Sequence, residues 1–293
     1  MSSSTVNGPK VGIAPKLSDS ELLTLAVMQA MLSFSNETQW RRYAKNHLTT
    51  LPVSAGPTWI QQATAQRSVD AQGSHPVPGR ADGHVHRRCV GGRLDPVECG
   101  RSTQTAKRSD LAGWAGYGYC ASHSRYFWGL RLHPVCTLAG VPITFALTHP
   151  KDDEREVLMG MFQVEPALVA QRPRQTVIGD KNYFGREFED RLRDARIRLL
   201  RPARKGETER PGSLLFKPLR QIIESINQTL KSQLDIEHHG GRTIAGVTVH
   251  VLQRILALTA AIWHNQQTGR PVLRSLTAYD HLIGLGISGG GLS

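Results

Sequence analysis

The sequence predicts an α/β protein in which a mixed β-sheet is flanked by helices and preceded by a small helical region. Three observations support this fold class. From about residue 126 onward, short apolar runs of strand length alternate with longer segments of helical periodicity. Two of the runs, 126–140 and 141–150, are joined by an Ala-Gly turn, which is typical of a β-hairpin. Two helix patterns also occur before residue 50.

Residues 1–50 form the predicted helical N-terminal region. The first helix, 18–32, begins with Ser18 and Asp19 and has apolar residues at helical spacing, and a second helix covers 36–48. The basic face of this pair is suited to DNA binding or to dimerisation. A packing pair with a solvated basic face explains the pattern equally well.

Residues 51–95 form a predicted irregular segment. They show no sustained helical or strand period and are rich in Gly, Pro, Ser and Gln. A structureless stretch of that length is unusual inside a compact protein, so the segment needs an explanation of its own.

Residues 96–270 contain the rest of the predicted sheet with its helices, and 271–293 form a Gly-rich C-terminal tail. After the hairpin, strands and helices alternate. The predicted helices are 152–162, 185–195, 216–234 and 245–265, and the predicted strands between them are 175–180 and 197–203.

The charge of the chain predicts a polyanionic partner. Lys and Arg total 36 against 24 Asp and Glu, which gives a net charge of +12. Nucleic acid is the first expectation and an anionic membrane surface the second. Gln253 and Arg254 interrupt the most apolar helical stretch before about 20 residues, so we expect no membrane span. The first ten residues lack the features of a secretion signal, which favours the cytoplasm.

The four cysteines predict reduced thiols, because no CxxC pair occurs. Cys120 with His123, and His133 with Cys136, have spacings that could be combined into a zinc site. A strand period of two would send His133 and Cys136 to opposite faces, which argues against that site.

Two carboxylates stand at positions suited to chemistry. Asp180 follows a short apolar strand, where α/β folds place ligands, although it could instead cap the next helix. Glu224 shares one predicted helix face with Arg220 and Lys231. An ordinary ion pair between Arg220 and Glu224 on a solvated face is the alternative.

Several segments resemble bacterial insertion-sequence transposases of the DDE class. In these proteins the third acid lies in a Y-x2-R-x3-E-x6-K pattern, which Arg220, Glu224 and Lys231 match while Lys217 replaces the tyrosine. The resemblance implies an RNase H-like core over residues 96–270. The segments that carry it are 108–147, 178–189, 197–207, 216–243 and 251–265.

This resemblance implies a metal-dependent DNA transposase. Asp180, Glu224 and a first aspartate would hold two Mg²⁺ ions, for which Mn²⁺ can substitute; hard cations of this kind prefer carboxylate oxygens. The implied partners are the element's terminal inverted repeats and target DNA, without a membrane, and we expect a homo-oligomer on DNA. An RNase H-like nuclease and a catalytically dead DNA-binding remnant are the alternatives. The residues expected to contact DNA are Arg220, Lys231, Lys181, Arg201, Arg204 and Lys205.

The first aspartate of the family is displaced in this chain. Members of the family resemble VWVVDSTPVECGRS, whose aspartate would fall at Arg93, whereas Asp95 stands two places later. Asp95 is therefore only a substitute for the first catalytic and metal-binding residue. Codons permitted for 84–96, read one base later, give Val-Trp-Val-Val-Asp-Ser-Thr. We therefore predict that residues from about 50 to 95 are read out of frame and that this copy is impaired.

Overall fold

The computed structural model describes residues 18–48, 88–91, 96–100, 103–120, 124–171 and 174–277. Asp95, His123 and most of the predicted C-terminal tail lie outside the described residues. Most of the predicted irregular segment lies outside them as well.

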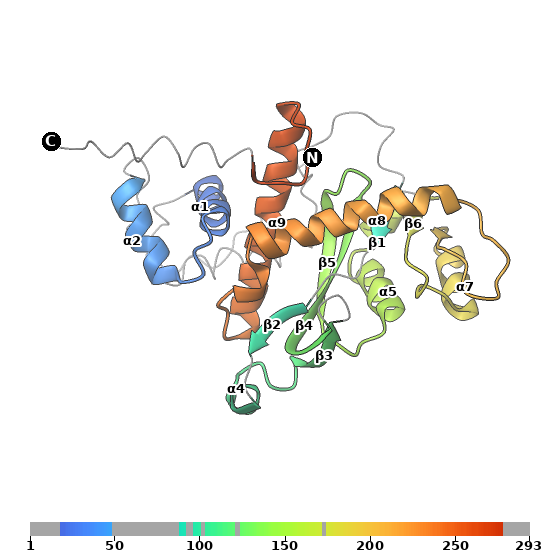
Figure 1. Cartoon of the computed structure of the whole chain (residues 1–293), viewed down its shortest axis with the longest axis horizontal. Helices are drawn as coiled ribbons and strands as arrows, with labels where there is room; N and C mark the ends of the chain where they lie inside the picture. The colour runs from blue at the N-terminus through green and yellow to red at the C-terminus, as the bar shows by residue number, and fades with distance from the viewer. Residues whose placement is uncertain are drawn as a thin grey trace, which may run out of the picture.

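A long antiparallel hairpin forms one half of the sheet (Figure 1). Strand β4 (Arg125–Thr137) pairs with β5 (Pro142–Thr148). At the turn, Gly140 has a φ of 89°, and its N–H donates to the carbonyl oxygen of Thr137 at 2.9 Å. Glycine adopts this left-handed conformation without steric cost. The hairpin predicted over 126–150 is thereby confirmed.

Three further strands of the sheet have an order that defines the fold. β1 (Arg88–Gly91) runs antiparallel to β4 and parallel to β6 (Thr176–Ile178), and β6 runs parallel to β7 (Arg198–Leu200). Val135 of β4 pairs with both Gly91 and Thr144, so β1 and β5 lie on opposite edges of β4. The resulting order, β5-β4-β1-β6-β7, is the RNase H-like arrangement.

Strand β1 corrects the prediction of an irregular segment over 51–95. Its four residues lie at the centre of the sheet, although they show no strand pattern in the sequence. The physical reason is that a ladder is made by backbone groups, and Arg88–Gly91 is too short to show a period.

Two more strands of the same sheet pair with the first half of β4. β2 (Pro96–Gly100) and β3 (Gly116–Cys120) both pair with Gly129, on opposite edges of β4. A side chain at Gly129 would lie 2.1 Å from the carbonyl oxygen of Val97, so the close approach requires glycine. The short helix α4 (Thr103–Arg108) connects β2 to β3 and was not predicted.

Helices cover both faces of the sheet. Leu130, Leu132 and Cys136 of β4 face one hydrophobic cluster, and Val135 faces another, as a strand period of two requires. On the first face lie α8 (Ser213–Gln228), the π-helix η1 (Thr229–Gln233), the 3-10 helix η2 (Ile236–His238) and α9 (Ile244–Gln267). On the second face lie α5 (Glu154–Val164), α6 (Ala167–Ala170) and α7 (Arg186–Asp194).

The predicted N-terminal helices are confirmed as α1 (Asp19–Met31) and α2 (Glu37–His47). Ser18 and Glu21 form the reciprocal capping box at the start of α1. Leu25 and Trp40 are fully buried against Val249 of α9. The two helices therefore pack on the core through α9, and their role in DNA binding or dimerisation stays a prediction.

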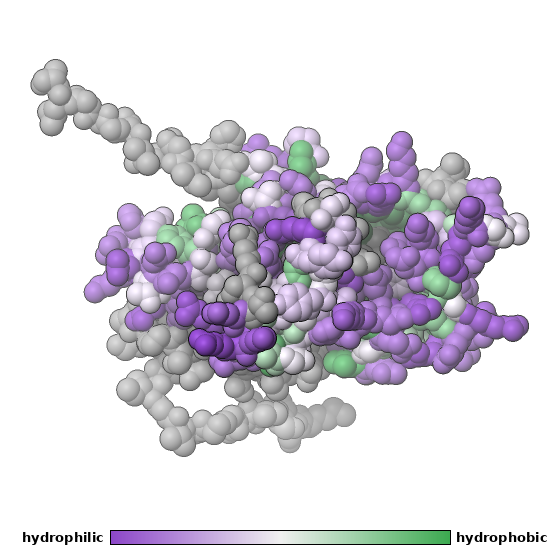
Figure 2. All heavy atoms as spheres, turned by 60° about the horizontal axis from the view of Figure 1, so that its bottom comes forward, coloured by the Kyte–Doolittle hydropathy of each residue, from purple (hydrophilic) through white to green (hydrophobic). Residues whose placement is uncertain are grey.

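Helix α9 is long and apolar enough to cross a membrane by length and composition, but 56% of the relevant window is buried inside the protein. It packs against the sheet as a core helix. On the face shown in Figure 2, hydrophilic side chains cover most of the described surface, and hydrophobic ones form small separate spots.

Candidate active site

Asp180 lies directly after β6, in a turn that its own side chain stabilises. Its Oδ1 accepts the backbone N–H of Asn182 at 2.7 Å, and its backbone carbonyl accepts the N–H of Tyr183 at 3.3 Å. Tyr183 is buried and fixes the turn to the second hydrophobic cluster. Helix α7 begins only at Arg186, after an N-cap at Gly185 that makes no side-chain cap bond. Asp180 therefore does not cap that helix, and its carboxylate stays exposed at the sheet rim.

Glu224 lies on the exposed face of α8. Its Oε1 accepts a hydrogen bond from Nε of Arg220 at 2.7 Å, and the two side chains are 58% and 81% exposed. Ile226, on the opposite side of the helix, is buried in the core. The shared face of Arg220 and Glu224 is confirmed. The pairing is also the ordinary ion pair of the alternative interpretation, so pairing alone does not separate the two.

Lys231, which helical spacing placed beside Arg220 and Glu224, is mostly buried, and this corrects the expectation of an exposed DNA contact there. The helix widens into a π-helix at Thr229–Gln233, so the count of 100° per residue no longer holds there. The Lys231 side chain is only 15% exposed, and its Nζ lies 3.4 Å from Oε1 of Glu237.

The elements that carry the two acids touch each other. Ile178 of β6 and Leu219 of α8 are buried in one hydrophobic cluster, together with partly buried side chains of β7 and α8. Asp180 comes two residues after Ile178, and Glu224 follows Leu219 by about one and a half helical turns. In Figure 1, α8 crosses the sheet in the region of β1 and β6.

The segment expected to supply the first acid leads to the same rim. Val90 pairs with Ile178 in parallel, so β1 and β6 end at the same edge of the sheet. On β4, Gly91 pairs with Val135 and Pro96 with Arg131, which leaves the ladder one residue out of step between β1 and β2. Asp95 itself lies outside the described residues.

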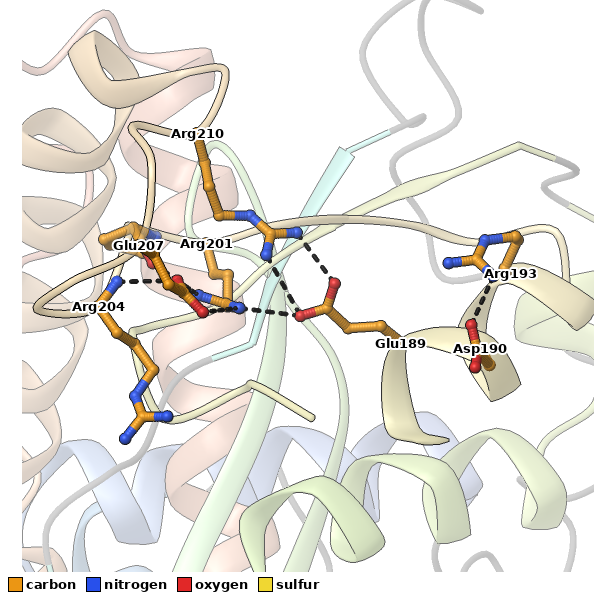
Figure 3. Close-up of polar contacts among 8 residues, drawn as sticks. Glu189, Asp190, Arg193, Arg201, Arg204, Glu207 and Arg210 are labelled. Carbon is orange, nitrogen blue, oxygen red and sulfur yellow. Dashed lines mark hydrogen bonds and ion pairs between the residues drawn. The ribbon is translucent and has the colours of Figure 1, made fainter. Parts of the chain in front are cut away.

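Arg201 occupies a buried position instead of the exposed one expected for a DNA contact. It is 3% exposed, donates to both oxygens of Glu207 at 2.7 and 2.9 Å, and donates to Glu189 at 3.0 and 3.1 Å (Figure 3). Arg210 also binds Glu189, at 3.0 Å. In this geometry the Arg201 guanidinium is engaged by carboxylates, which gives it a structural position.

The carboxylates of this network are held ionised. Hydrogen bonds from Arg201 lower the pKa of Glu207 to about 2. Burial acts to raise the pKa of Glu189, but hydrogen bonds from Arg210 and Arg201 outweigh it and the pKa is lowered. The sequence offered no signal for this network, because its members are spread over α7 and the loop that follows β7.

The remaining basic residues near Asp180 are exposed. Lys181, Arg204 and Lys205 all have exposed side chains, and the Arg204 guanidinium lies 3.6 Å from the centroid of the Phe184 ring. A pocket of about 540 Å³ lies beside this stack; Phe184, Arg186 and Glu189 are among the residues that line it. The stack and the pocket connect the Asp180 turn to α7.

A zinc site receives no support from the described residues. They contain no group of three or more His, Cys, Asp or Glu side chains arranged to hold a metal ion. Cys136 is buried in the first hydrophobic cluster, and the ring of His133 lies 3.2 Å from the hydroxyl of Thr148.

The comparison with protein families matches residues 97–244 to the transposase DDE domain, which is half of the chain. The chain belongs to the transposase DDE domain family. The match begins one residue after Pro96, where we expect the family's reading frame to resume. The DDE domain thus includes Asp180 and Glu224, whereas β1 and the N-terminal helices precede the matched residues.

The comparison with solved structures matches this chain to two complexes. A pre-cleavage Mos1 transpososome has 14% identity and a TM-score of 0.23, with 87% of this chain and 82% of that chain covered. The Mos1 strand transfer complex has 14% identity and a TM-score of 0.25, with coverage of 88% and 81%. TM-scores this low do not support a fold assignment, so the RNase H-like fold is assigned from the strand order of the sheet. No curated protein matches the chain.

The described acids of this DDE domain fit a divalent cation in kind. Asp180 and Glu224 offer hard oxygen donors on exposed side chains. The two oxygens of Asp180 accept from the backbone and side-chain amides of Asn182, and one oxygen of Glu224 accepts from Arg220. Two carboxylates are fewer than the three that the family pattern implies. The third donor would have to come from the segment after β1.

Proposed function

We propose that this member of the DDE domain family is a DNA transposase that binds the ends of its own insertion element and catalyses metal-dependent cleavage and strand transfer. The observation that carries the proposal is the position of Asp180 at the sheet rim where β1 and β6 end, next to the helix that carries Glu224. This rim is where α/β sheets place their ligands.

In this proposal Asp180 and Glu224 hold two Mg²⁺ ions together with a third donor at or near Asp95. Such ions, when bound, activate the attacking hydroxyl and stabilise the leaving oxygen of a phosphodiester. Arg220 would leave Glu224 and turn to a phosphate, for which its planar guanidinium is suited. An exposed pair of this kind is worth about 0.5 kcal/mol, so its exchange costs little.

The proposed DNA contacts are made by exposed cations near the rim. Lys181 and Lys205 are exposed. Lys181 lies in the Asp180 turn, and Lys205 lies in the loop after β7. The net charge of +12 favours a polyanion along a wider surface. Arg201 and Lys231 would contribute indirectly, since both are bound by glutamates inside the protein. We further propose a homo-oligomer on the element ends and a cytoplasmic location.

A catalytically dead DNA-binding remnant is the second candidate, and one observation favours it. The position that should hold the first aspartate is Arg93, and Pro96 directly after Asp95 fixes its own φ and removes a ladder donor. The nucleotides across codons 45 to 100 test the cause: we expect a family-like reading one base away, and its absence would refute the frameshift.

Nicking of a DNA duplex that carries the element's terminal repeat tests the proposed function. We expect Mg²⁺- or Mn²⁺-dependent nicking that Asp180→Asn and Glu224→Gln abolish, and restoration of the shifted frame should raise it. Transfer of the freed 3′-end to target DNA separates a transposase from an RNase H-like nuclease. If the protein binds the repeat but does not nick it, even after the frame is restored, the function is that of a catalytically dead DNA-binding remnant.

A further inference from the structure

We propose that Arg204 is a positioning residue for Asp180, acting through the ring of Phe184. The inference rests on the proposed function, because it assigns Asp180 to the metal site, and it adds a residue that does not itself touch the metal.

The conformation of the Asp180 turn depends on contacts of Phe184, its last residue, as well as on the hydrogen bonds of Asp180. The turn runs from Asp180 to Phe184, where the N–H of Phe184 donates to the carbonyl oxygen of Asn182 at 2.9 Å. Phe184 is half-buried, whereas Asp180 at the other end is exposed. Contacts that restrain the Phe184 ring therefore also restrain the turn that orients the Asp180 carboxylate.

Two arginines from other elements restrain Phe184. Arg204, from the loop after β7, places its guanidinium 3.6 Å from the ring centroid. Arg155, from α5, lies 5.4 Å from the centroid and donates from Nη1 to the carbonyl oxygen of Phe184 at 2.8 Å. Asp153 binds Arg155 in turn. Arginine over an aromatic ring is attracted by the ring's quadrupole and by stacking.

Arg204 is itself fixed in place, which an exposed arginine usually is not. Its backbone N–H donates to Oε2 of Glu207 at 2.9 Å, and the N–H of Glu207 donates to the carbonyl oxygen of Arg204 at 3.0 Å. Glu207 is bound through both oxygens by the buried Arg201, which also binds Glu189 on α7 (Figure 3). The loop from 201 to 210 is thus hydrogen-bonded to α7, and it holds Arg204 against the Phe184 ring of the Asp180 turn.

The direction in which metal affinity changes when Arg204 is removed distinguishes a positioning role from a purely electrostatic one. Loss of a positive charge beside the Asp180 turn should by itself favour binding of a cation there. If Arg204 positions Asp180, loss of its side chain should instead weaken the cation, because removal of groups that orient metal ligands typically costs about 10- to 100-fold in affinity.

Mn²⁺ titration of the full-length protein, followed by the electron paramagnetic resonance signal of the free ion, tests the inference. We expect Arg204→Ala and Phe184→Leu each to weaken Mn²⁺ binding about 10-fold. Their combination should weaken it no further, because both remove the same contact. Arg204→Lys should recover part of the affinity. Arg186→Ala is the matched control: it removes an exposed arginine two residues after Phe184, and Mn²⁺ binding should stay equal or strengthen.

Hydrogen exchange of the amides from 180 to 185, in metal-free protein, gives a second reading. It should accelerate in Arg204→Ala and in Phe184→Leu, and stay unchanged in Arg186→Ala. Unchanged Mn²⁺ affinity in Arg204→Ala, beside a wild-type protein that binds Mn²⁺ and nicks DNA, overturns the positioning role alone. A protein that neither binds Mn²⁺ nor nicks DNA, in the frame-restored form as well as in the present one, overturns the proposed function, and the positioning role with it.

Discussion

Nε of Arg254, a buried residue of α9, donates a 2.7 Å hydrogen bond to the carbonyl oxygen of Leu234, the C-cap of the π-helix that continues the Glu224 helix. The same side chain donates from Nη1 to the carbonyl oxygen of His250 at 3.0 Å. Burial lowers the pKa of Arg254 to about 10. A buried cation thus satisfies carbonyl groups at the end of the long helix and holds that helix against α9.

We predict that Arg254→Met lowers the free energy of unfolding by about 1–3 kcal/mol, because it leaves buried carbonyl oxygens without their donor. Arg254→Ala should cost more, since a cavity adds to the lost hydrogen bonds. Urea unfolding followed by far-UV circular dichroism measures both. Arg270→Ala, at an exposed arginine after α9, should change stability by no more than about 0.5 kcal/mol. Equal effects at the two sites would contradict the role of Arg254.

The N-terminal helices should unfold together with the core. Leu25 is fully buried beside Trp40 and Val249, so Leu25→Ala should lower the free energy of unfolding by about 2–5 kcal/mol. Leu23, two residues away and 38% exposed, is the matched control, and its replacement by alanine should cost well under half as much. A separate low-stability transition for the N-terminal helices, with the core transition unmoved by Leu25→Ala, would show that the helices are an independent unit.

Stability should fall as the pH drops from 7.5 to 5.5. Burial, reinforced by the charge of Arg254, lowers the pKa of His239 and of His250 to about 4 in the folded protein. The unfolded chain, with an ordinary pKa near 6.5, binds more protons below pH 6.5, so acid favours unfolding until the folded pKa is passed. The expected loss is about 1 kcal/mol per histidine over this range.

Urea unfolding at the two pH values measures that loss. His239→Gln should reduce the pH dependence, because one of the two protonation sites is gone. The prediction fails if stability is flat between pH 7.5 and 5.5.

Salt should weaken DNA binding steeply, and the exposed lysines near Asp180 should account for part of the slope. Each phosphate contact contributes about 0.9 to the slope of log K against log salt concentration. The double variant Lys181→Ala, Lys205→Ala should reduce the slope by about 2. Fluorescence anisotropy with a labelled terminal-repeat duplex gives the slope. Lys151→Ala, in the turn before α5, serves as the comparison and should keep it within about 0.5.

Much of the architecture could be predicted because it is local. The hairpin of β4 and β5, the start of α1 at Ser18, and the alternation of strand and helix through α9 all follow from period, turn chemistry and capping residues. The exposed face shared by Arg220 and Glu224 follows from helical geometry in the same way.

Other features could not be predicted because they depend on distant partners. The strand β1 exists through its ladders with β4 and β6, and the burial of Arg201 depends on Glu189 and Glu207 reaching it from α7 and from its own loop. The π-helix around Lys231 and the contact of Lys231 with Glu237 likewise have no signature in the local spacing.

The sequence by itself determined the class of this protein and its basic charge, and it singled out Asp180 and Glu224 as candidate site residues, since motif spacing and local periodicity are properties of the chain. Only the tertiary structure decided which arginines are buried, which strand lies at the sheet centre, and which side chains press on the Asp180 turn. Those depend on long-range packing and ion pairing, in which residues far apart in sequence compete for the same partners.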